Sequence, residues 1–187
     1  MSRPVYEVEV AVQSASMSLI QAAKQGDDSA FEILLEPMLD HAYRLACGML
    51  HDSHAAEDAV QEAALKAWRK LAHLREDSEM RPWFLGIVAN ECRSARRSRW
   101  WSVIRSVLPE GNAESPEDAV LSGIEVRRAL SAMDRHKRLV LVLHWYLDLP
   151  LDEIAAITGT SVHGAESRLL RATHELKRRM EAHRGRP

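Results

Sequence analysis

The side chains of this sequence that could bind a partner fall into two adjoining stretches of opposite charge. Residues 27–62 hold nine acidic side chains and one arginine, whereas residues 63–105 hold ten basic side chains and four acidic ones. The basic stretch also contains five large aromatic side chains, namely Trp68, Trp83, Phe84, Trp100 and Trp101. Basic side chains attract phosphate, and aromatic rings stack on unpaired bases. The basic stretch therefore predicts nucleic-acid binding, and the acidic stretch, which repels nucleic acid, predicts a protein partner.

Within the basic stretch, helical spacing brings polar side chains onto one face. Asn90, Arg93 and Arg97 are separated by three and four residues, so they share a face, and Arg96 belongs to the same arginine run. Such a face can hold a phosphate backbone while Asn90 contacts a base edge. Trp83 could stack on an unpaired base, although an aromatic residue that opens an apolar helix is more commonly part of the core.

The acidic stretch has its candidate protein contacts at Asp58, Gln61 and Glu62. They lie close together on a predicted helix whose other positions are mostly alanine or valine. These small residues keep the helix slim and suited to close packing, and carboxylates beside such a surface fit a basic partner. The alternative is a face that only contacts solvent, which is the commoner role of a charge run.

A second candidate nucleic-acid site lies near the carboxyl terminus. Residues 151–158 predict a short helix that ends at Gly159, because glycine tolerates the left-handed conformation of a helix end. Thr160 and Ser161 can cap a following helix. Together they form a helix-turn-helix pattern, whose second helix enters the major groove. The residues predicted to face DNA are His163, Gly164, Glu166, Ser167, Arg168 and Arg171. The alternative is a helical hairpin with solvated arginines.

Helices must position these sites, and the spacing of apolar residues predicts an all-α chain of two small domains. A loosely ordered leader is expected over residues 1–17, followed by a first helical domain over residues 18–105. Residues 106–118 contain two prolines, a glycine and four acidic residues, and predict a flexible acidic linker. Residues 119–187 predict the helix-turn-helix domain, with helices over residues 119–133, 137–147, 151–158 and 162–180.

The composition argues against several classes of protein. The longest apolar run, Leu139–Leu143, is far shorter than the ~20 residues of a membrane helix, so no membrane insertion is expected. No signal peptide is visible, and Cys47 and Cys92 form no CxxC pair, so we expect a cytoplasmic protein with reduced thiols. Motifs for covalent catalysis and phosphate-binding loops are missing, and we expect neither enzyme activity nor a cofactor.

Histidines offer a weaker hypothesis, that of a helical metal or redox protein. His51 and His54 have a spacing that metal ligands can use. Their turn-like surroundings and the lack of a second ligand pair count against a metal site, and we expect none.

Three segments together resemble a known family. Residues 56–62 (AEDAVQE) with 67–69 (AWR) resemble the core-polymerase-binding helix of bacterial sigma factors. Residues 81–93 (RPWFLGIVANECR) resemble their promoter-melting segment. Residues 139–172, ending in SRLLRA, resemble their module for the minus-thirty-five element. With only a short acidic linker between the domains, the resemblance is to the extracytoplasmic-function (ECF) subfamily, over roughly residues 18–180.

The resemblance implies a transcription initiation factor that binds core RNA polymerase, recognises and melts the minus-ten element of promoter DNA and binds the minus-thirty-five element. It places Asp58, Gln61, Glu62 and Trp68 against the polymerase. It places Trp83, Asn90, Arg93, Arg96 and Arg97 at the minus-ten element. It places His163, Glu166, Ser167, Arg168 and Arg171 at the minus-thirty-five element. A regulatory anti-sigma factor is expected from the family.

The sequence departs from the family pattern at one place. Where the family usually has a Thr-Val-Lys run, this chain has Gly164-Ala165-Glu166. A hydroxyl and a cation are lost, and Glu166 repels phosphate unless it accepts from a cytosine amino group. Binding to the minus-thirty-five element is therefore expected to be weaker or to have an unusual preference. The alternative to a sigma factor is a stand-alone helix-turn-helix regulator, which leaves the acidic helix unexplained.

Overall fold

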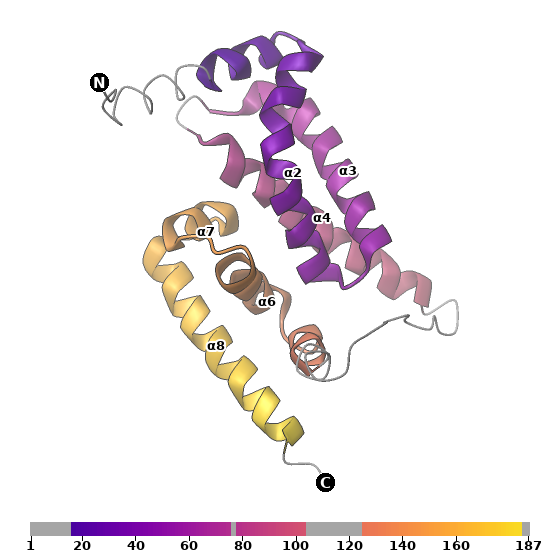
Figure 1. The fold of residues 1–187 in the computed structure, drawn as a ribbon, viewed down its shortest axis with the longest axis vertical. Coiled ribbons are helices and arrows are strands. Elements are labelled where there is room, and N and C mark those ends of the chain that lie inside the picture. The colour runs from indigo at the N-terminus through magenta and orange to yellow at the C-terminus, as the bar shows by residue number, and fades with distance from the viewer. Residues whose placement is uncertain (1–15, 76–77, 104–124, 185–187) are drawn as a thin grey trace, which may run out of the picture.

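The fold is built from helices, and the part of the chain that the structure describes contains no strand, which confirms the all-α prediction. The computed structural model describes residues 16–75, 78–103 and 125–184, without the side chains of residues 96–103 and 183–184. After a helical segment at residues 16–24, the first domain continues with α2 (Asp28–Leu50), α3 (Ser53–Lys70), the 3-10 turn η1 (Leu71–His73) and α4 (Met80–Val103) (Figure 1).

The second domain begins with a helical segment at residues 125–131. It continues with α6 (Arg135–Leu141), the π-helical turn η2 (Val142–Tyr146), α7 (Leu151–Thr158) and α8 (Val162–Arg184). These elements agree with the four helices predicted for this part of the chain. The predicted linker at 106–118 lies outside the described residues, as does the leader except for residues 16 and 17, which are already helical.

In the first domain, aspartates start the helices and alanines bring them together. The Asp27 carboxylate accepts a hydrogen bond from the backbone N–H of Ala30 at 3.1 Å, and Asp52 does the same for Ala55 at 2.8 Å, so each helix has a satisfied first turn. One side of α3 consists of buried alanines, which let the helix pack closely against both α2 and α4: Ala56, Ala59, Ala63 and Ala67.

In the second domain, α7 and α8 form the predicted helix-turn-helix. Gly159 ends α7 with φ 64°, a left-handed conformation that favours glycine. The Ser161 hydroxyl then accepts a hydrogen bond from the Gly164 backbone N–H at 3.1 Å and caps α8. Ala165 and Ala172, two turns apart on α8, are fully buried and fix which side of α8 faces the domain core.

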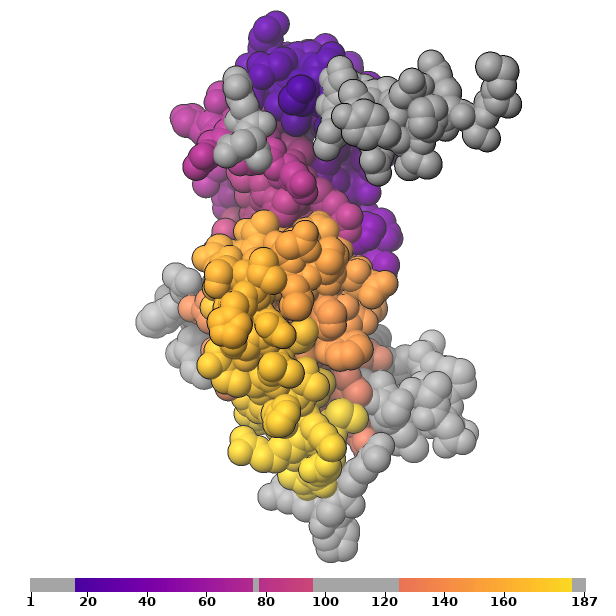
Figure 2. Space-filling view, turned by 90° about the vertical axis from the view of Figure 1, so that its left-hand side faces the viewer, coloured from indigo at the N-terminus to yellow at the C-terminus, as the bar shows by residue number. Residues whose placement is uncertain are grey.

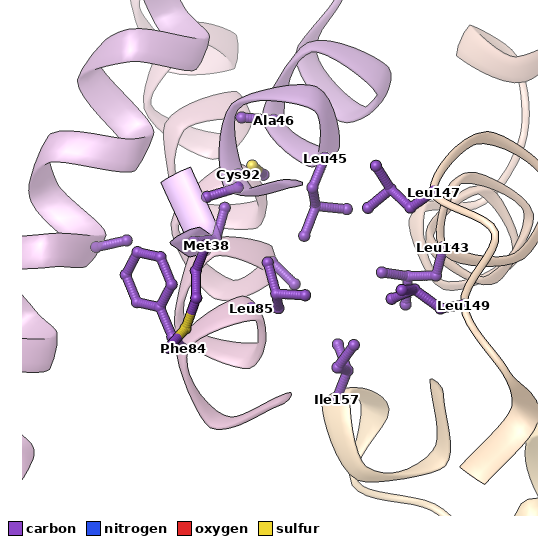
Figure 3. Close-up of a cluster of buried hydrophobic side chains, with 14 of the residues drawn as sticks. Met38, Leu45, Ala46, Phe84, Leu85, Cys92, Leu143, Leu147, Leu149 and Ile157 are labelled. Atoms are coloured by element: carbon purple, nitrogen blue, oxygen red, sulfur yellow. The ribbon is translucent and has the colours of Figure 1, made fainter. Parts of the chain in front are cut away.

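The two domains pack directly against each other and share one apolar core, an arrangement that the sequence analysis did not predict. Figure 3 shows Leu143, Leu147, Leu149 and Ile157 of the second domain directed at Leu45 and Leu85 of the first. Gly48 allows this approach, because a Cβ atom there would lie 2.8 Å from a methyl group of Val142. The second domain is stacked beneath the first, with α7 nearest the contact (Figure 2).

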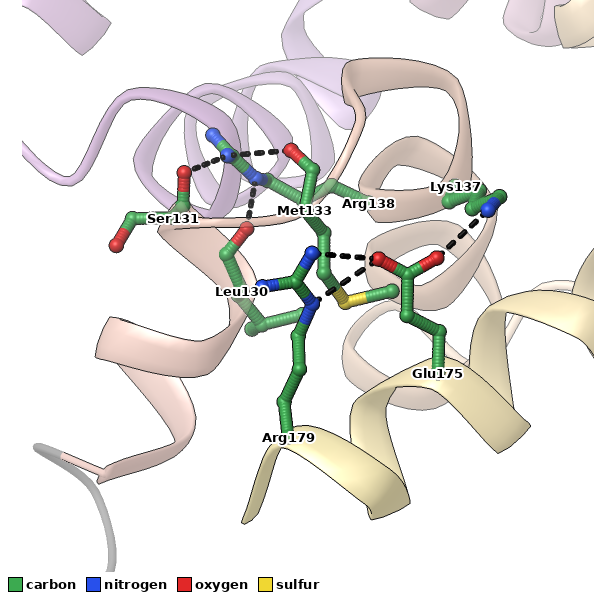
Figure 4. A network of polar contacts seen from close by, with 7 residues as sticks. All are labelled: Leu130, Ser131, Met133, Lys137, Arg138, Glu175 and Arg179. Atoms are coloured by element: carbon green, nitrogen blue, oxygen red, sulfur yellow. Dashed lines mark hydrogen bonds and ion pairs between the residues drawn. The ribbon is translucent and has the colours of Figure 1, made fainter. Parts of the chain in front are cut away.

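Arg138 is the only buried charged side chain among the described residues, at 1% exposure. Its guanidinium donates to the carbonyl oxygens of Leu130 (2.7 Å), Ser131 (2.8 Å) and Met133 (3.3 Å), which follow or end the helical segment at residues 125–131 (Figure 4). It also donates to the carbonyl of Met49 at 3.0 Å, near the C-terminus of α2, whose last turn holds no basic residue. One cation thus stabilises the negative ends of two helices in two domains.

Glu175 ties α8 to α6. Its carboxylate lies 2.6 Å from Nζ of Lys137 and 2.8 Å from Nη2 of Arg179 (Figure 4). These hydrogen bonds, that of Lys137 first, lower the pKa of Glu175 below its ordinary value of 4.5. The ion pairs therefore stabilise the fold above pH 4.5 and are lost as the pH falls through the lower folded-state pKa.

Glu175→Gln is expected to lower the free energy of unfolding at pH 7 by less than about 1 kcal/mol, because both cations are more than one third exposed. The difference from the parent protein should shrink as the pH falls below 4.5, where the parent loses the same charge. Urea unfolding followed by circular dichroism across this pH range measures it. A difference that is the same at every pH would show that the charge of Glu175 is not responsible.

Candidate functional site

The outward side of α3 carries the candidate protein contacts. Asp58 and Gln61 are exposed, opposite the buried alanines. Leu65 is exposed at 51% and lies on the same face as Asp58, seven residues on. Leu65 was not predicted as a contact residue, although its spacing from Asp58 places it on the same helix face. This face combines a carboxylate, an amide and an apolar side chain.

Glu62 and Trp68 are less available than the sequence suggests. Glu62 pairs with Lys66 at 3.2 Å, and Lys66 lies 2.5 Å from Glu91 of α4. Glu62 thus belongs to an ionic link between α3 and α4. The half-buried Trp68 has its ring centroid 5.0 Å from that of Phe31 on α2. Its ring contributes to the packing of the domain, while Asp58 and Gln61 point to solvent.

The predicted polar face of α4 is partly described. Asn90 is exposed, and its side-chain oxygen accepts a hydrogen bond from Nη2 of the half-buried Arg93. Burial, and then the positive charge of Arg135 in the second domain, lower the pKa of Arg93. Arg96 and Arg97 lie in α4, but their side chains are outside the described residues, as are those of Trp100 and Trp101.

The opposite side of α4 is core. Phe84, Val88 and Cys92, spaced four residues apart, are buried, whereas Ile87 is half-buried. Burial raises the pKa of the Cys92 thiol to about 12. A thiol this hard to ionise packs as an apolar group and is unreactive.

The first turn of α4 packs against α7. Nε of Arg81 is 3.1 Å from a carboxylate oxygen of Glu153, and Trp83 lines a hollow with Pro150 and Ala156. Burial raises the pKa of Glu153 although Arg81 opposes the shift. The end of α4 that carries Trp83, predicted to meet an unpaired base, is therefore partly covered by the second domain.

The outward side of α8 carries the candidate duplex contacts. His163, Glu166 and Arg171 are exposed, whereas Ser167 and Arg168 are half-buried. His163 lies 3.7 Å from the Glu166 carboxylate.

The turn explains Gly164, because a Cβ atom there would lie 2.5 Å from the Thr160 hydroxyl oxygen. A larger residue would require the Thr160 side chain to rotate away. Glycine at this position therefore fits the local packing of the turn.

The described residues contain no group of three or more His, Cys, Asp or Glu side chains placed to hold a metal ion. They also contain no helix that is both long and apolar enough to cross a membrane.

Known proteins match both domains of the chain. Sigma-70 region 2 matches residues 34–102, and sigma-70 region 4 matches residues 124–174. The ECF RNA polymerase sigma-E factor of Escherichia coli is 27% identical over 185 residues, which cover 90% of this chain and 96% of that protein. The chain is an ECF sigma factor. It is therefore a transcription initiation factor that works with core RNA polymerase and gives it promoter specificity, and the stand-alone regulator is not favoured.

Further relatives agree in length and fold. The RNA polymerase sigma-H factor of Pseudomonas aeruginosa is 26% identical over 184 residues, covering 90% of this sigma factor and 95% of the relative. CnrH, solved in complex with the cytosolic domain of CnrY, has a TM-score of 0.69 at 25% identity. The match covers 90% of this chain and 98% of the CnrH chain. RpoE of Bartonella quintana, solved in complex with the anti-sigma factor NepR, has a TM-score of 0.64 at 27% identity. The match covers 81% of this chain and 96% of the RpoE chain.

Proposed function

We propose that this sigma factor docks on core RNA polymerase through the outward face of α3, with Asp58 and Gln61 at its centre. The exposure of these two side chains, on a helix whose other side is buried alanine, carries the proposal. Leu65 extends the face with apolar area, and a carboxylate beside apolar surface suits a basic helical partner. Glu62 acts mainly by holding α3 to α4 through Lys66, and Trp68 by packing the helix on Phe31.

The minus-ten element is bound by α4. Asn90 meets a base edge, its orientation set by the hydrogen bond from Arg93, while Arg93, Arg96 and Arg97 neutralise the phosphate backbone. Trp83 lies at the opposite end of the same helix and supports an unpaired base. The spacing of these residues on one helix and the exposure of Asn90 support this assignment.

The minus-thirty-five element is bound by the outward face of α8. His163 and Glu166 meet base edges near the N-terminus of the helix, where recognition helices read the major groove. Ser167, Arg168 and Arg171 contact the phosphate backbone or bases further along. The exposure of His163, Glu166 and Arg171 on one side of α8, opposite buried Ala165 and Ala172, supports this arrangement.

Arg171→Ala is expected to weaken binding of the holoenzyme to promoter DNA and to reduce the slope of log affinity against log salt by about one, because one phosphate contact is lost. Filter binding at several salt concentrations measures both quantities. Lys24→Ala, which removes one basic side chain from the other domain, serves as the control. An unchanged salt slope would remove Arg171 from the DNA contacts.

We also propose that an anti-sigma factor holds this protein inactive. In support, both solved relatives described above are complexes with a second protein, and one of those proteins is named an anti-sigma factor. The protein works in the cytoplasm beside core polymerase and catalyses no reaction of its own, in keeping with a family of non-catalytic factors. A regulator of this kind should copurify with the chain from its own cells and suppress transcription when added back.

The proposal is tested by selecting DNA from a random library with the reconstituted holoenzyme. Two short elements separated by a spacer are expected, and the chain alone should not select the same pair. Selection of one element by the chain without polymerase would support the stand-alone regulator and overturn the proposal.

A further inference from the structure

Leu170 is an apolar side chain on the outward face of α8. It is 58% exposed, although its neighbour Leu169 is packed against the core. Ala165 and Ala172, which face the core, are fully buried, so the inward side of α8 is fixed and Leu170 points away from it. In Figure 2, α8 faces the viewer and is not covered by other described elements.

The surroundings of Leu170 are polar and carry charges of both signs. It lines an open hollow along α8 whose charged members are the bases Lys137, Arg171, Lys177 and Arg178 and the acids Glu175 and Glu181. Four residues before it, on the same side of the helix, lies Glu166. An exposed leucine alone is ordinary on a protein surface. On the helix face proposed to enter the major groove, however, an exposed leucine among charged side chains can make an apolar contact with a base.

We infer that Leu170 recognises a thymine in the minus-thirty-five element through the C5 methyl group of the base. Thymine is the only base of unmodified DNA with a methyl group in the major groove, and proteins read it by apolar contact. Arg171 beside Leu170 anchors the backbone or a guanine. This inference rests on the proposed assignment of α8 to the minus-thirty-five element.

The spacing along α8 predicts where the thymine lies. Glu166 and Leu170 are one helical turn apart, about 6 Å along the axis at ~1.5 Å per residue. Base pairs are stacked about 3.4 Å apart. The thymine read by Leu170 therefore lies one or two base pairs from the cytosine whose amino group donates to Glu166.

The test replaces single thymines by uracil in the minus-thirty-five element that the holoenzyme selects. Uracil pairs like thymine and lacks only the methyl group. With the parent protein, one replacement is expected to lower affinity about fourfold, the loss expected when one methyl group is no longer buried. With Leu170→Ala, the same replacement should change affinity by less than about 1.5-fold. Ile33→Ala, an apolar residue 56% exposed on α2, serves as the matched control and should retain the fourfold effect.

The outcomes separate the inference from the assignment on which it rests. If the holoenzyme selects a minus-thirty-five element but no uracil replacement lowers affinity, Leu170 reads no methyl group and the inference is wrong. The same follows if Leu170→Ala is as sensitive to uracil as the parent, or if it lowers affinity for core polymerase and leaves DNA binding unchanged. If no minus-thirty-five element is selected at all, the assignment of α8 has failed.

Discussion

Replacing Arg138 by Met is expected to lower the free energy of unfolding by about 3 kcal/mol or more. Methionine fills much of the same space and removes every donor. The carbonyl groups of Leu130, Ser131, Met133 and Met49 would lose a charged partner in a buried setting. Two helix ends would also lose their stabilising cation.

Chemical unfolding followed by circular dichroism measures the effect. Arg128→Met is the matched control, because Arg128 belongs to the same helical segment and is exposed; its expected change is within about 0.5 kcal/mol. If both variants lose the same stability, the role assigned to the buried guanidinium is wrong.

Arg138 also affects how the two domains are joined. Binding both promoter elements requires the domains to separate, since positions about 25 base pairs apart are about 85 Å apart on B-form DNA, whereas α7 lies directly on α4. A Cβ atom at Gly86 would be in van der Waals contact with the Ile157 carbonyl oxygen, at 3.4 Å. Since the hydrogen bond from Arg138 in α6 to Met49 in α2 also joins the two domains, the Arg138→Met protein should populate separated domains more often in the absence of denaturant. Small-angle X-ray scattering should then give a larger radius of gyration.

Asp58→Arg is expected to weaken binding to core polymerase by about 30-fold or more, which corresponds to roughly 2 kcal/mol. The substitution replaces a carboxylate by a cation, which a basic partner surface repels. Asp58 is exposed and lies opposite the buried alanines of α3, so the fold should be retained. Competition against a labelled sigma factor for limiting core polymerase measures the affinity.

The control for Asp58→Arg is Glu32→Arg, which makes the same change of charge at an exposed position on α2. It should bind core polymerase within about threefold of the parent, since a charge outside the interface acts mainly through weak long-range attraction. Equal losses for both variants would indicate a general effect of net charge. No loss for Asp58→Arg would place the polymerase interface elsewhere.

Local features of the fold were predictable because each depends on neighbouring residues. The alanine spacing of α3, the stop at Gly159 and the cap at Ser161 are all visible in the sequence, and the structure contains each of them. Helical spacing likewise placed Asp58 with Gln61. The position of Trp68 could not be judged this way, because its packing depends on Phe31 of another helix.

The contact between the domains was not predictable from periodicity. Leu143, Leu147 and Leu149 would look the same in the core of one domain as in a core shared by two. Arg138 is one of several arginines in the chain, and its role depends on the hydrogen bond to the Met49 carbonyl of α2, which the sequence does not show. Leu169 and Leu170 are adjacent, and only the register of α8 shows which of them is exposed.

The central claim is that this chain directs core RNA polymerase to specific promoters through both of its domains. Run-off transcription with purified core polymerase, on templates carrying the two selected elements, tests it most directly. The parent protein is expected to yield a transcript of one defined length, which is lost when either element is scrambled and when Asp58→Arg replaces the parent. A transcript that forms equally well on scrambled templates, or none with the parent protein, would contradict the account.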